Sequence, residues 1–371
     1  MLILGLVLFI LLVVVHEFGH FMTARRNGVE VEEFGIFFPP RLWSRKTKKG
    51  WEFSVNVIPL GGFVRLKGEH DSDTGKGTYG ASSLWVKTKI LLAGVGMNLV
   101  AAFVLLTILA WAGMPTLVNN QFTVHSDTKM VEDEVLIGSV QPNSPAASIH
   151  LETGDRLVSI GRIGSPLKNI QNADSLPGIT KSLAGDKVRV TYERNKQQYS
   201  AETTLLSSKV VDASQKTNNP KGYLGISPTQ YTLSRSTWSA PVVGIGLLWQ
   251  FVALTFHGIW TALGGLFSGN TAQATAQVAG PVGIFEILKN GSLLGYQFVL
   301  MIVAVISLSL AVMNVLPIPA LDGGKLFVTL VTRAFHRKLS ERAEALIYGA
   351  GFIFLVILII LITIVDVRRN H

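Results

Sequence analysis

Apolar residues in this chain fall into long, nearly uncharged runs, separated by stretches in which charged residues are frequent. Runs of helix length lie at residues 2–24, 90–113, 298–316 and 345–365. At about 1.5 Å per residue, each run can cross a hydrocarbon core about 30 Å thick. The pattern therefore predicts a polytopic α-helical membrane protein with about four transmembrane helices.

A fifth apolar run, residues 241–267, is also long enough to cross a bilayer. If it crossed, however, the run after it would no longer pass from the outer side to an inner side rich in basic residues. We therefore expect residues 241–290 to form an amphipathic or interfacial segment without a net crossing, and an extra span is the alternative.

Strand-like alternation marks the segment between the first two runs, residues 27–89, with turn signals at Pro39-Pro40 and Gly61-Gly62. We expect a β-hairpin or small sheet associated with the cytoplasmic face of the membrane, followed by a loop. An edge strand there could pair with an extended polypeptide, because it presents free N–H and C=O groups. A purely structural hairpin fits the same pattern.

Residues 119–230 have balanced charges and apolar runs of strand length, which predicts an inserted α+β domain. Ser144-Pro145-Ala146-Ala147, followed by Leu151 and Gly154-Asp155-Arg156, resembles the signature of bacterial, circularly permuted PDZ domains. The resemblance implies that a short loop accepts peptide C-termini through its backbone N–H groups. The residues of that loop would be Tyr223, Leu224, Gly225 and Ile226.

Composition supports the membrane interpretation and narrows the chemistry. The 371 residues are 48% hydrophobic and only 15% charged, with a mean hydropathy of +0.39, which is too apolar for an ordinary soluble protein. The net charge of +9 comes from basic residues that flank the apolar runs, as the positive-inside rule predicts, and we expect no nucleic-acid partner. The absence of cysteine leaves His, Asp and Glu as ligands for any metal.

The first apolar run contains His16-Glu17-Phe18-Gly19-His20. Two histidines four residues apart share one face of a helix, where their imidazoles can hold one Zn²⁺ while the glutamate reaches a water. An ionisable group at membrane depth is costly, so it indicates function. Arg25 and Arg26 end the run and place the motif near the cytoplasmic side.

The third run ends in a polar, proline-broken stretch from Asn314 to Asp322. Broken helices are tolerated at membrane depth where the freed backbone is buried or lines a wet cavity. The first and third spans both run from outside to inside, so Asp322 lies at the depth of the two histidines. It is the natural third ligand and leaves one position open. Taken alone, Asp322 could equally cap the following helix.

Together these motifs resemble the site-2 protease family of intramembrane zinc metalloproteases, in the bacterial regulator-of-sigma-E form with one PDZ domain. The segment Pro59-Leu60-Gly61-Gly62-Phe63-Val64, the pair Gly280-Pro281 and the Asn-x-x-Pro-x-Pro-x-x-Asp-Gly stretch also carry the resemblance. One departure lies in the second span, where Gly94 to Asn98 lacks the family's Gly-Pro; its small residues suit close helix packing.

The resemblance implies roles for individual residues. His16, His20 and Asp322 would bind zinc, and Glu17 would move the proton from the attacking water to the leaving amine. Substrate contacts would come from Asn314, Gly61, Gly62 and Pro317.

The expected function is regulated proteolysis of single-span membrane proteins, such as anti-sigma factors or signal-peptide remnants, after their outer part has been trimmed. The alternative is a non-catalytic membrane scaffold with a peptide-binding PDZ domain. We expect a multi-pass protein of the bacterial inner membrane, in contact with the lipid bilayer, with its PDZ-like domain extracytoplasmic. The expected segments are residues 1–26 (span 1), 27–89 (β region), 90–114 (span 2), 119–230 (PDZ-like), 241–290 (interfacial), 298–324 (span 3), 325–342 (cytoplasmic loop) and 343–366 (span 4).

Overall fold

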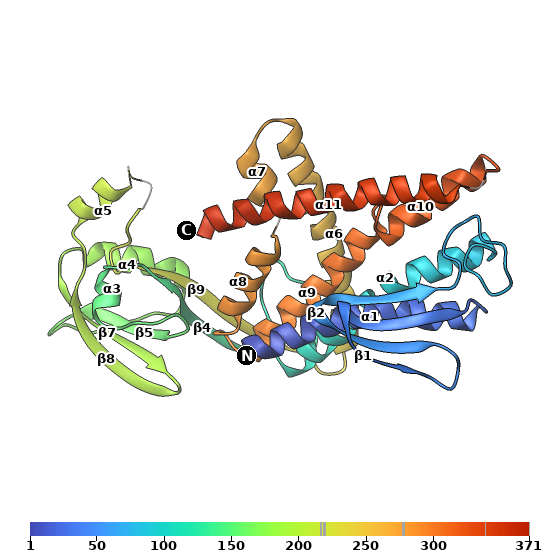
Figure 1. Ribbon diagram of the computed structural model, residues 1–371. Coiled ribbons are helices and arrows are strands. Elements are labelled where there is room, and N and C mark those ends of the chain that lie inside the picture. Colours follow the sequence, from blue (N-terminus) through green and yellow to red (C-terminus); the bar gives the residue numbers. More distant parts are fainter. Residues whose placement is uncertain (216, 218–219, 277–278, 338, 371) are drawn as a thin grey trace. The chain divides into compact units, whose positions relative to one another are not determined.

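The computed structural model describes residues 1–370, except 216, 218, 219, 277, 278 and 338. The chain divides into two compact units (Figure 1). The helical unit comprises Met1–Ala110 and Ser239–His371, and the strand-rich unit comprises Trp111–Trp238. The strand-rich unit is thus inserted into the sequence of the helical unit.

Five helices of the helical unit are long and apolar enough to cross a membrane. A helix satisfies its backbone hydrogen bonds internally, as a bilayer requires. The five are α1 (Leu2–Arg26), α2 (Leu84–Ala112), α6 (Ala240–Phe267), α9 (Tyr296–Val315) and α11 (Glu341–Asn370). The shorter helices are α7 (Thr271–Ala276), α8 (Pro281–Gly291) and α10 (Asp322–Ala334).

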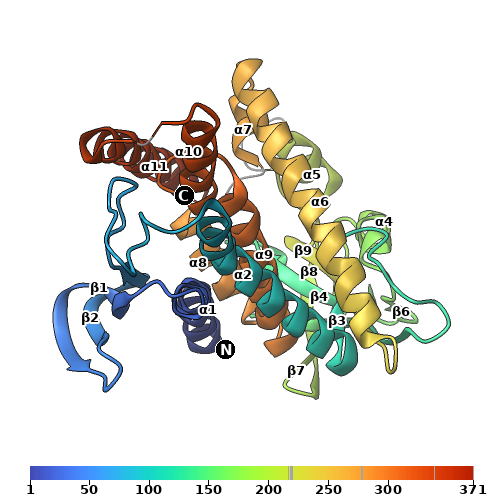
Figure 2. The ribbon, with the colours of Figure 1, turned by 90° about the vertical axis from the view of Figure 1, so that its right-hand side faces the viewer.

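α6 is a fifth candidate by length and composition, so the expectation of about four spans stays a prediction. The interfacial course of residues 241–290 stays a prediction, and residues 277 and 278 within it lie outside the described residues. In the helical unit α1 packs against β2 and α9, and α6 packs against α9 (Figure 2).

The third segment, expected over residues 298–324 with its helix broken by prolines near the end, contains α9, which ends at Val315. Pro317 and Pro319 explain this end, because proline lacks the N–H that a helix needs and disfavours helical backbone at the residue before it. Within the expected cytoplasmic loop, residues 325–342, α10 is helical through Ala334, and the cytoplasmic placement of this segment stays a prediction.

The expected small sheet is present between α1 and α2. It consists of β1 (Val31–Lys46) and β2 (Glu52–Leu66), which pair antiparallel. Gly35 lies opposite both Ser54 and Phe63, so β2 bends back and flanks the first half of β1 on both sides. In this register the segment 62–66 pairs only with β1 among the described strands, and its other side is an open edge.

The strand-rich unit is an antiparallel sheet with short helices, which agrees with the α+β class expected for it. Its strands lie in the order β3-β9-β4-β5-β7-β8, with β6 paired to β5. They are β3 (Met114–Pro115), β4 (Lys129–Val140), β5 (Arg156–Arg162), β6 (Lys168–Asn169), β7 (Lys187–Arg194), β8 (Gln197–Thr204) and β9 (Ile226–Arg235). The helices are α3 (Pro145–Ser148), η1 (Ala173–Ser175), α4 (Leu176–Ser182) and α5 (Ser208–Ser214).

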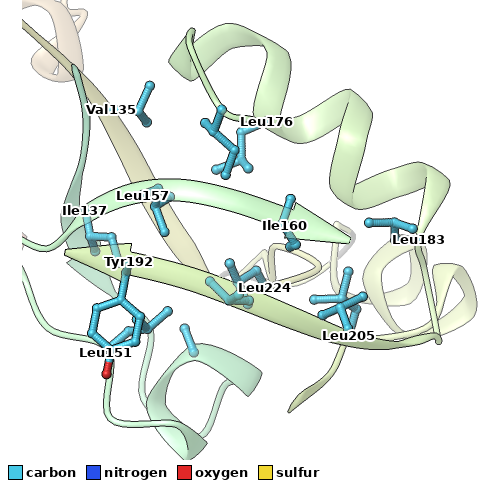
Figure 3. Close-up of a cluster of buried hydrophobic side chains, with 14 of the residues drawn as sticks. Val135, Ile137, Leu151, Leu157, Ile160, Leu176, Leu183, Tyr192, Leu205 and Leu224 are labelled. Carbon is cyan, nitrogen blue, oxygen red and sulfur yellow. The ribbon is translucent and has the colours of Figure 1, made fainter. Parts of the chain in front are cut away.

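An apolar core fills this unit (Figure 3). It gathers alternate residues of the strands, such as Val135 and Ile137 of β4 and Val188 and Val190 of β7, with Leu176 from α4. Alternation along a strand places every second side chain on the core face, which is why the sequence pattern located these strands. The core includes Leu224, which is 2% exposed.

The loop before β9 fits closely against the start of α3. Ser144 caps α3 by accepting the Ala147 N–H at 3.1 Å. Gly225 has a φ of +80°, and a Cβ there would lie 2.2 Å from the Ser144 Cβ. Both the backbone conformation and the available space therefore require glycine at position 225.

Candidate active site

α1 and α10 bring three side chains with lone pairs to one point in the helical unit. His16 and His20 lie one turn apart on α1, and Asp322 is the first residue of α10. The Asp322 Oδ2 lies 3.2 Å from the Nε2 of His16 and 3.2 Å from the Nε2 of His20. One potential ligand atom from each residue lies within 4.8 Å of the others.

His20 is held in the tautomer that a metal ligand needs. Its Nδ1 lies 2.7 Å from the carbonyl oxygen of Ile90, on α2. A carbonyl only accepts hydrogen bonds, so Nδ1 carries the proton and Nε2 presents its lone pair to Asp322 and His16. A carbonyl that orients an imidazole in this way is the usual outer partner of a metal-ligating histidine.

The convergence itself indicates a cation. The two Nε2 atoms lie 3.2 Å apart, and the Asp322 Oδ2 between them is shielded from solvent without a hydrogen-bond partner among the described residues. Two imidazole nitrogens and a carboxylate oxygen this close together repel each other unless a proton or a metal ion lies between them. Two histidines and one carboxylate form a common donor set of catalytic zinc sites, so these residues fit Zn²⁺.

A glycine on α2 makes room for both imidazoles. A Cβ at Gly94 would lie 2.4 Å from the His20 Nε2 and 2.6 Å from the His16 Cε1. On the other side of the interface, a Cβ at Gly19 would lie 2.6 Å from the Ala93 carbonyl oxygen. The sequence indicated a packing role for Gly94, but its part in shaping the site was missed, because no pattern within α2 reveals which side chains of α1 face it.

The turn before Asp322 depends on the two glycines after it. A Cβ at Gly323 would lie 2.2 Å from the Val315 carbonyl oxygen, and one at Gly324 would lie 2.0 Å from the Ile318 carbonyl oxygen. α10 can therefore start folded back against the end of α9. The N-cap of α10 is Leu321 and not Asp322, so the capping alternative for Asp322 is not what the structure shows.

The three candidate ligands line a cavity of about 400 Å³ in the helical unit. Glu17 and Asn314 line the same cavity. The Glu17 Cγ is 3.4 Å from the position of a Cβ at Gly62, so β2 runs directly beside Glu17. A carboxylate that shares a cavity with a metal can act on a water held there.

Tyr79 also lines this cavity, and the sequence had given no reason to consider it. Burial raises the pKa of the Tyr79 phenol, which therefore stays protonated and neutral at physiological pH. The ammonium group of Lys87 lies 5.2 Å from the centre of its ring. Polar groups therefore extend along the cavity beyond the candidate ligands.

Some predicted substrate residues lie elsewhere. Pro317 is exposed and is not among the described residues that line the cavity. A Cβ at Gly61 would lie 3.2 Å from the Phe38 ring and 3.6 Å from a Val13 methyl group, so Gly61 packs between the sheet and α1. Of the two glycines, only Gly62 lies against Glu17.

The predicted peptide-binding residues of the PDZ-like domain belong to the strand-rich unit. Leu224 contributes its side chain to the core, so only its backbone could meet a ligand. The carbonyl oxygens of Tyr223, Leu224 and Gly225 accept the N–H groups of Leu206, Ala146 and Gln141 at 3.0, 2.9 and 2.8 Å. These bonds hold the loop to the body of the unit.

Comparison with known proteins yields relatives along almost the whole chain. The family model described as peptidase family M50 matches residues 4–358. A Clostridium perfringens protein that bears the name of a zinc metalloprotease is 28% identical over 98% of this chain and 97% of its own length. A Campylobacter jejuni protein with the same designation is 30% identical over 96% of this chain and 90% of its own.

One solved structure is similar to a part of the chain. It is the PDZ domain of an SdrC-like protein from Listeria monocytogenes, 24% identical, covering 27% of this chain and 93% of that domain, with a TM-score of 0.21. A likeness at this score carries no argument about fold or ligand.

The family match spans both the His-Glu motif of α1 and the aspartate that begins α10, and the full-length relatives bear the names of zinc metalloproteases. Several of its helices can cross a membrane. The chain thus belongs to peptidase family M50, the site-2 proteases, and is a multi-pass zinc metalloprotease of intramembrane proteolysis.

Proposed function

We propose that this chain is an intramembrane endopeptidase in which His16, His20 and Asp322 hold Zn²⁺ and Glu17 is the general base. One observation carries the assignment. Residues about 300 positions apart in the sequence place three potential ligand atoms within 4.8 Å of one another, in a cavity that also contains the Glu17 carboxylate. A scaffold protein would have no use for such a costly arrangement of buried polar groups.

Individual residues of the chain would carry out different steps of the hydrolysis. When bound, Zn²⁺ acts as a Lewis acid that polarises the scissile carbonyl and lowers the pKa of a water. Glu17 accepts a proton from the attacking water and returns it to the leaving amine. Ile90 keeps the His20 ring oriented while charge develops, because its carbonyl fixes the proton on Nδ1.

Single-span membrane proteins are the substrates that fit this site. A helical substrate hides its carbonyls in hydrogen bonds, so it has to unwind before it is cut. The open edge of residues 62–66, beside Glu17, can pair with the extended chain. Gly62 allows close approach, and the Asn314 amide can bond to the unwound backbone. Pro317, exposed beyond the end of α9, is open to contact with the same segment.

The strand-rich unit would act as a PDZ-like filter that accepts peptide C-termini. In a trans peptide the N–H points opposite to the preceding C=O. Because the carbonyls of residues 223–225 point into the unit, the N–H groups of Leu224, Gly225 and Ile226 point away from it. Backbone N–H groups that face away from the unit could bind a carboxylate.

The orientation in the membrane follows from the charges. Arg25 and Arg26 end α1, so the metal site would lie near the cytoplasmic side of a bacterial inner membrane, with the strand-rich unit outside. Anti-sigma factors and signal-peptide remnants, trimmed beforehand on the outer side, are substrates of the right form.

Replacement of Glu17 by glutamine tests the assignment. Glutamine keeps the size of the side chain but cannot take up the proton, so zinc content should be unchanged while cleavage of a membrane-anchored reporter stops. Glu286→Gln is the matched control, because Glu286 lies on α8 in an exposed pair with Lys289 at 3.5 Å. Cleavage by the Glu17→Gln protein at the parent rate would refute the proposal, and absence of zinc from the parent would favour the scaffold alternative.

A further inference from the structure

Buried charged residues form a second polar group beside the candidate metal site. Lys87 is 1% exposed, Glu344 6% and Asp71 8%, and all three line the same cavity as the candidate ligands. Buried charges are costly unless they are paired. The proposed hydrolysis uses none of them, so their presence needs another explanation.

The pairs among these residues join four parts of the helical unit. The Lys87 ammonium, on α2, donates to the Asp71 Oδ1, and the Arg333 Nη2, on α10, lies 3.3 Å from the same oxygen. The Asp71 backbone N–H donates to the Glu344 Oε1, on α11, at 2.9 Å, and the His70 Nδ1 donates to the Glu344 Oε2 at 2.9 Å. We call these five residues the clasp.

The two helices that the clasp holds are the ones that enclose the turn before Asp322. α10 begins with Asp322 and carries Arg333 three turns later. α11 approaches the turn through Gly351, where a Cβ would lie 2.2 Å from the Pro319 carbonyl oxygen. Glu344 and Gly351 are seven residues apart, so they share one face of α11. The clasp therefore fixes both sides of the turn that presents Asp322.

At its far end α11 is held to α8, where the buried Asp366 carboxylate accepts the N–H groups of Gly280 and Gly283 at 2.8 and 2.9 Å, but the long apolar stretch between this end and Glu344 is little buried. Only 11% of its most apolar stretch is buried, compared with 39% for α2 and 44% for α9. In a bilayer no hydrophobic force drives one helix against another, because lipid is as apolar as the neighbouring side chains. Polar contacts and close backbone packing then determine where such a helix lies.

From these contacts we propose that Asp71 is a positioning residue for Asp322. Through Arg333 it fixes α10, and through Glu344 it fixes α11, so the Asp322 carboxylate stays opposite His16 and His20. This inference rests on the proposed metal site. Loss of the clasp should lower zinc affinity by about tenfold, the lower end of the effect of outer-shell partners, because Asp71 acts through two helices.

The experiment measures the zinc affinity of the purified full-length protein by competition with a chromophoric chelator. Arg333→Gln is the main variant, because it keeps the buried Lys87–Asp71 pair and should fold. Asp71→Asn and Glu344→Gln extend the series, and Arg333→Lys should recover part of the affinity. Glu286→Gln is again the control, since its pair with Lys289 is exposed and belongs to α8.

Two further readouts separate positioning from mere stability. The visible spectrum of the Co²⁺-loaded protein reports ligand geometry, and it should change in the clasp variants. Thermal unfolding of the metal-free protein should show that they remain folded at the assay temperature. Zinc affinity within about twofold of the parent together with an unchanged Co²⁺ spectrum would overturn the proposal, as would a loss that only follows unfolding.

The same measurement separates the two proposals from each other. If the parent binds no zinc, the metal site is wrong. If the parent binds zinc and the clasp variants bind it equally well, the metal site stands and only the role of Asp71 is wrong.

Discussion

The two halves of the candidate metal site are held by different means. His16 and His20 lie on a long helix that meets α2 at close quarters, with Gly19 and Gly94 at the contact and the Ile90 carbonyl bonded to His20. Asp322 begins a short helix after a proline-broken turn, where glycine contacts and distant ion pairs hold it. The histidine half is set by direct contact of α2 with the two rings, whereas the aspartate half depends on the glycine contacts of its turn and on ion pairs that act through two helices.

Gly94→Ala should displace His16 and His20 and cause the largest loss of zinc affinity among the variants. The added methyl group would overlap both imidazoles, at 2.4 and 2.6 Å, so the rings must turn away. We expect zinc affinity to fall by more than about a hundredfold, beyond the loss caused by an outer-shell partner. Chelator competition measures it.

Gly96→Ala is the matched control on the same helix, because a Cβ at Gly96 meets nothing within 4 Å. If the two alanine variants bind zinc equally, α2 does not shape the site.

Gly351→Ala should disturb the aspartate half by a smaller amount. Its methyl group would lie 2.2 Å from the Pro319 carbonyl oxygen, so α11 must move away from the turn. We expect roughly a tenfold loss of zinc affinity, since a lipid-facing helix can yield where α2 cannot. Gly349→Ala, where a Cβ would meet nothing within 4 Å, serves as the control. A loss as large as that of Gly94→Ala would contradict the difference between the two halves.

A change of pH should have the smallest effect, a small change in thermal stability that arises from the titration of His70 in the clasp. The hydrogen bond with the Glu344 carboxylate raises the pKa of His70, with Glu341 and Asp73 adding to the effect. The ion pair thus contributes fully below the ordinary histidine pKa, about 6.5, and is lost as pH rises through the raised value. His70 is half exposed, so the change is small.

The midpoint of thermal unfolding, followed from pH 6 to 9, should fall with rising pH more in the parent than in His70→Gln. Parallel curves would show that the pair does not contribute.

Sequence reasoning reached the histidine half more completely than the aspartate half. The spacing of His16 and His20 fixes their common helix face, and Asp322 followed from the direction of two spans. The packing around them could not be predicted, because hydropathy shows which segments are apolar but not which surfaces meet. Gly94 illustrates this, since its neighbours are in another helix.

α10 was missed for a related reason. Its helix is short and amphipathic, and the basic residues at Lys325 and Arg333 made it look like a cytoplasmic loop. Asp71 carries no local signal, because it lies in a loop rich in glycine and serine, and its partners Arg333 and Glu344 are more than 260 residues away. The strands were easier to predict, because apolar and polar residues alternate within each strand and no distant residue is needed to see this pattern.

One turn of α2 supplies the orientation and the space that the histidines of the His-Glu motif need. Ile90 supplies the acceptor that sets the tautomer of His20, and Gly94, four residues later on the same face, leaves the space that both rings occupy. A designer who transplants only the five residues of the motif into another helical bundle would therefore obtain two histidines with free rotamers and an undetermined proton. The transferable unit is a pair of crossing helices, one bearing the ligands and the other a carbonyl and a glycine one turn apart.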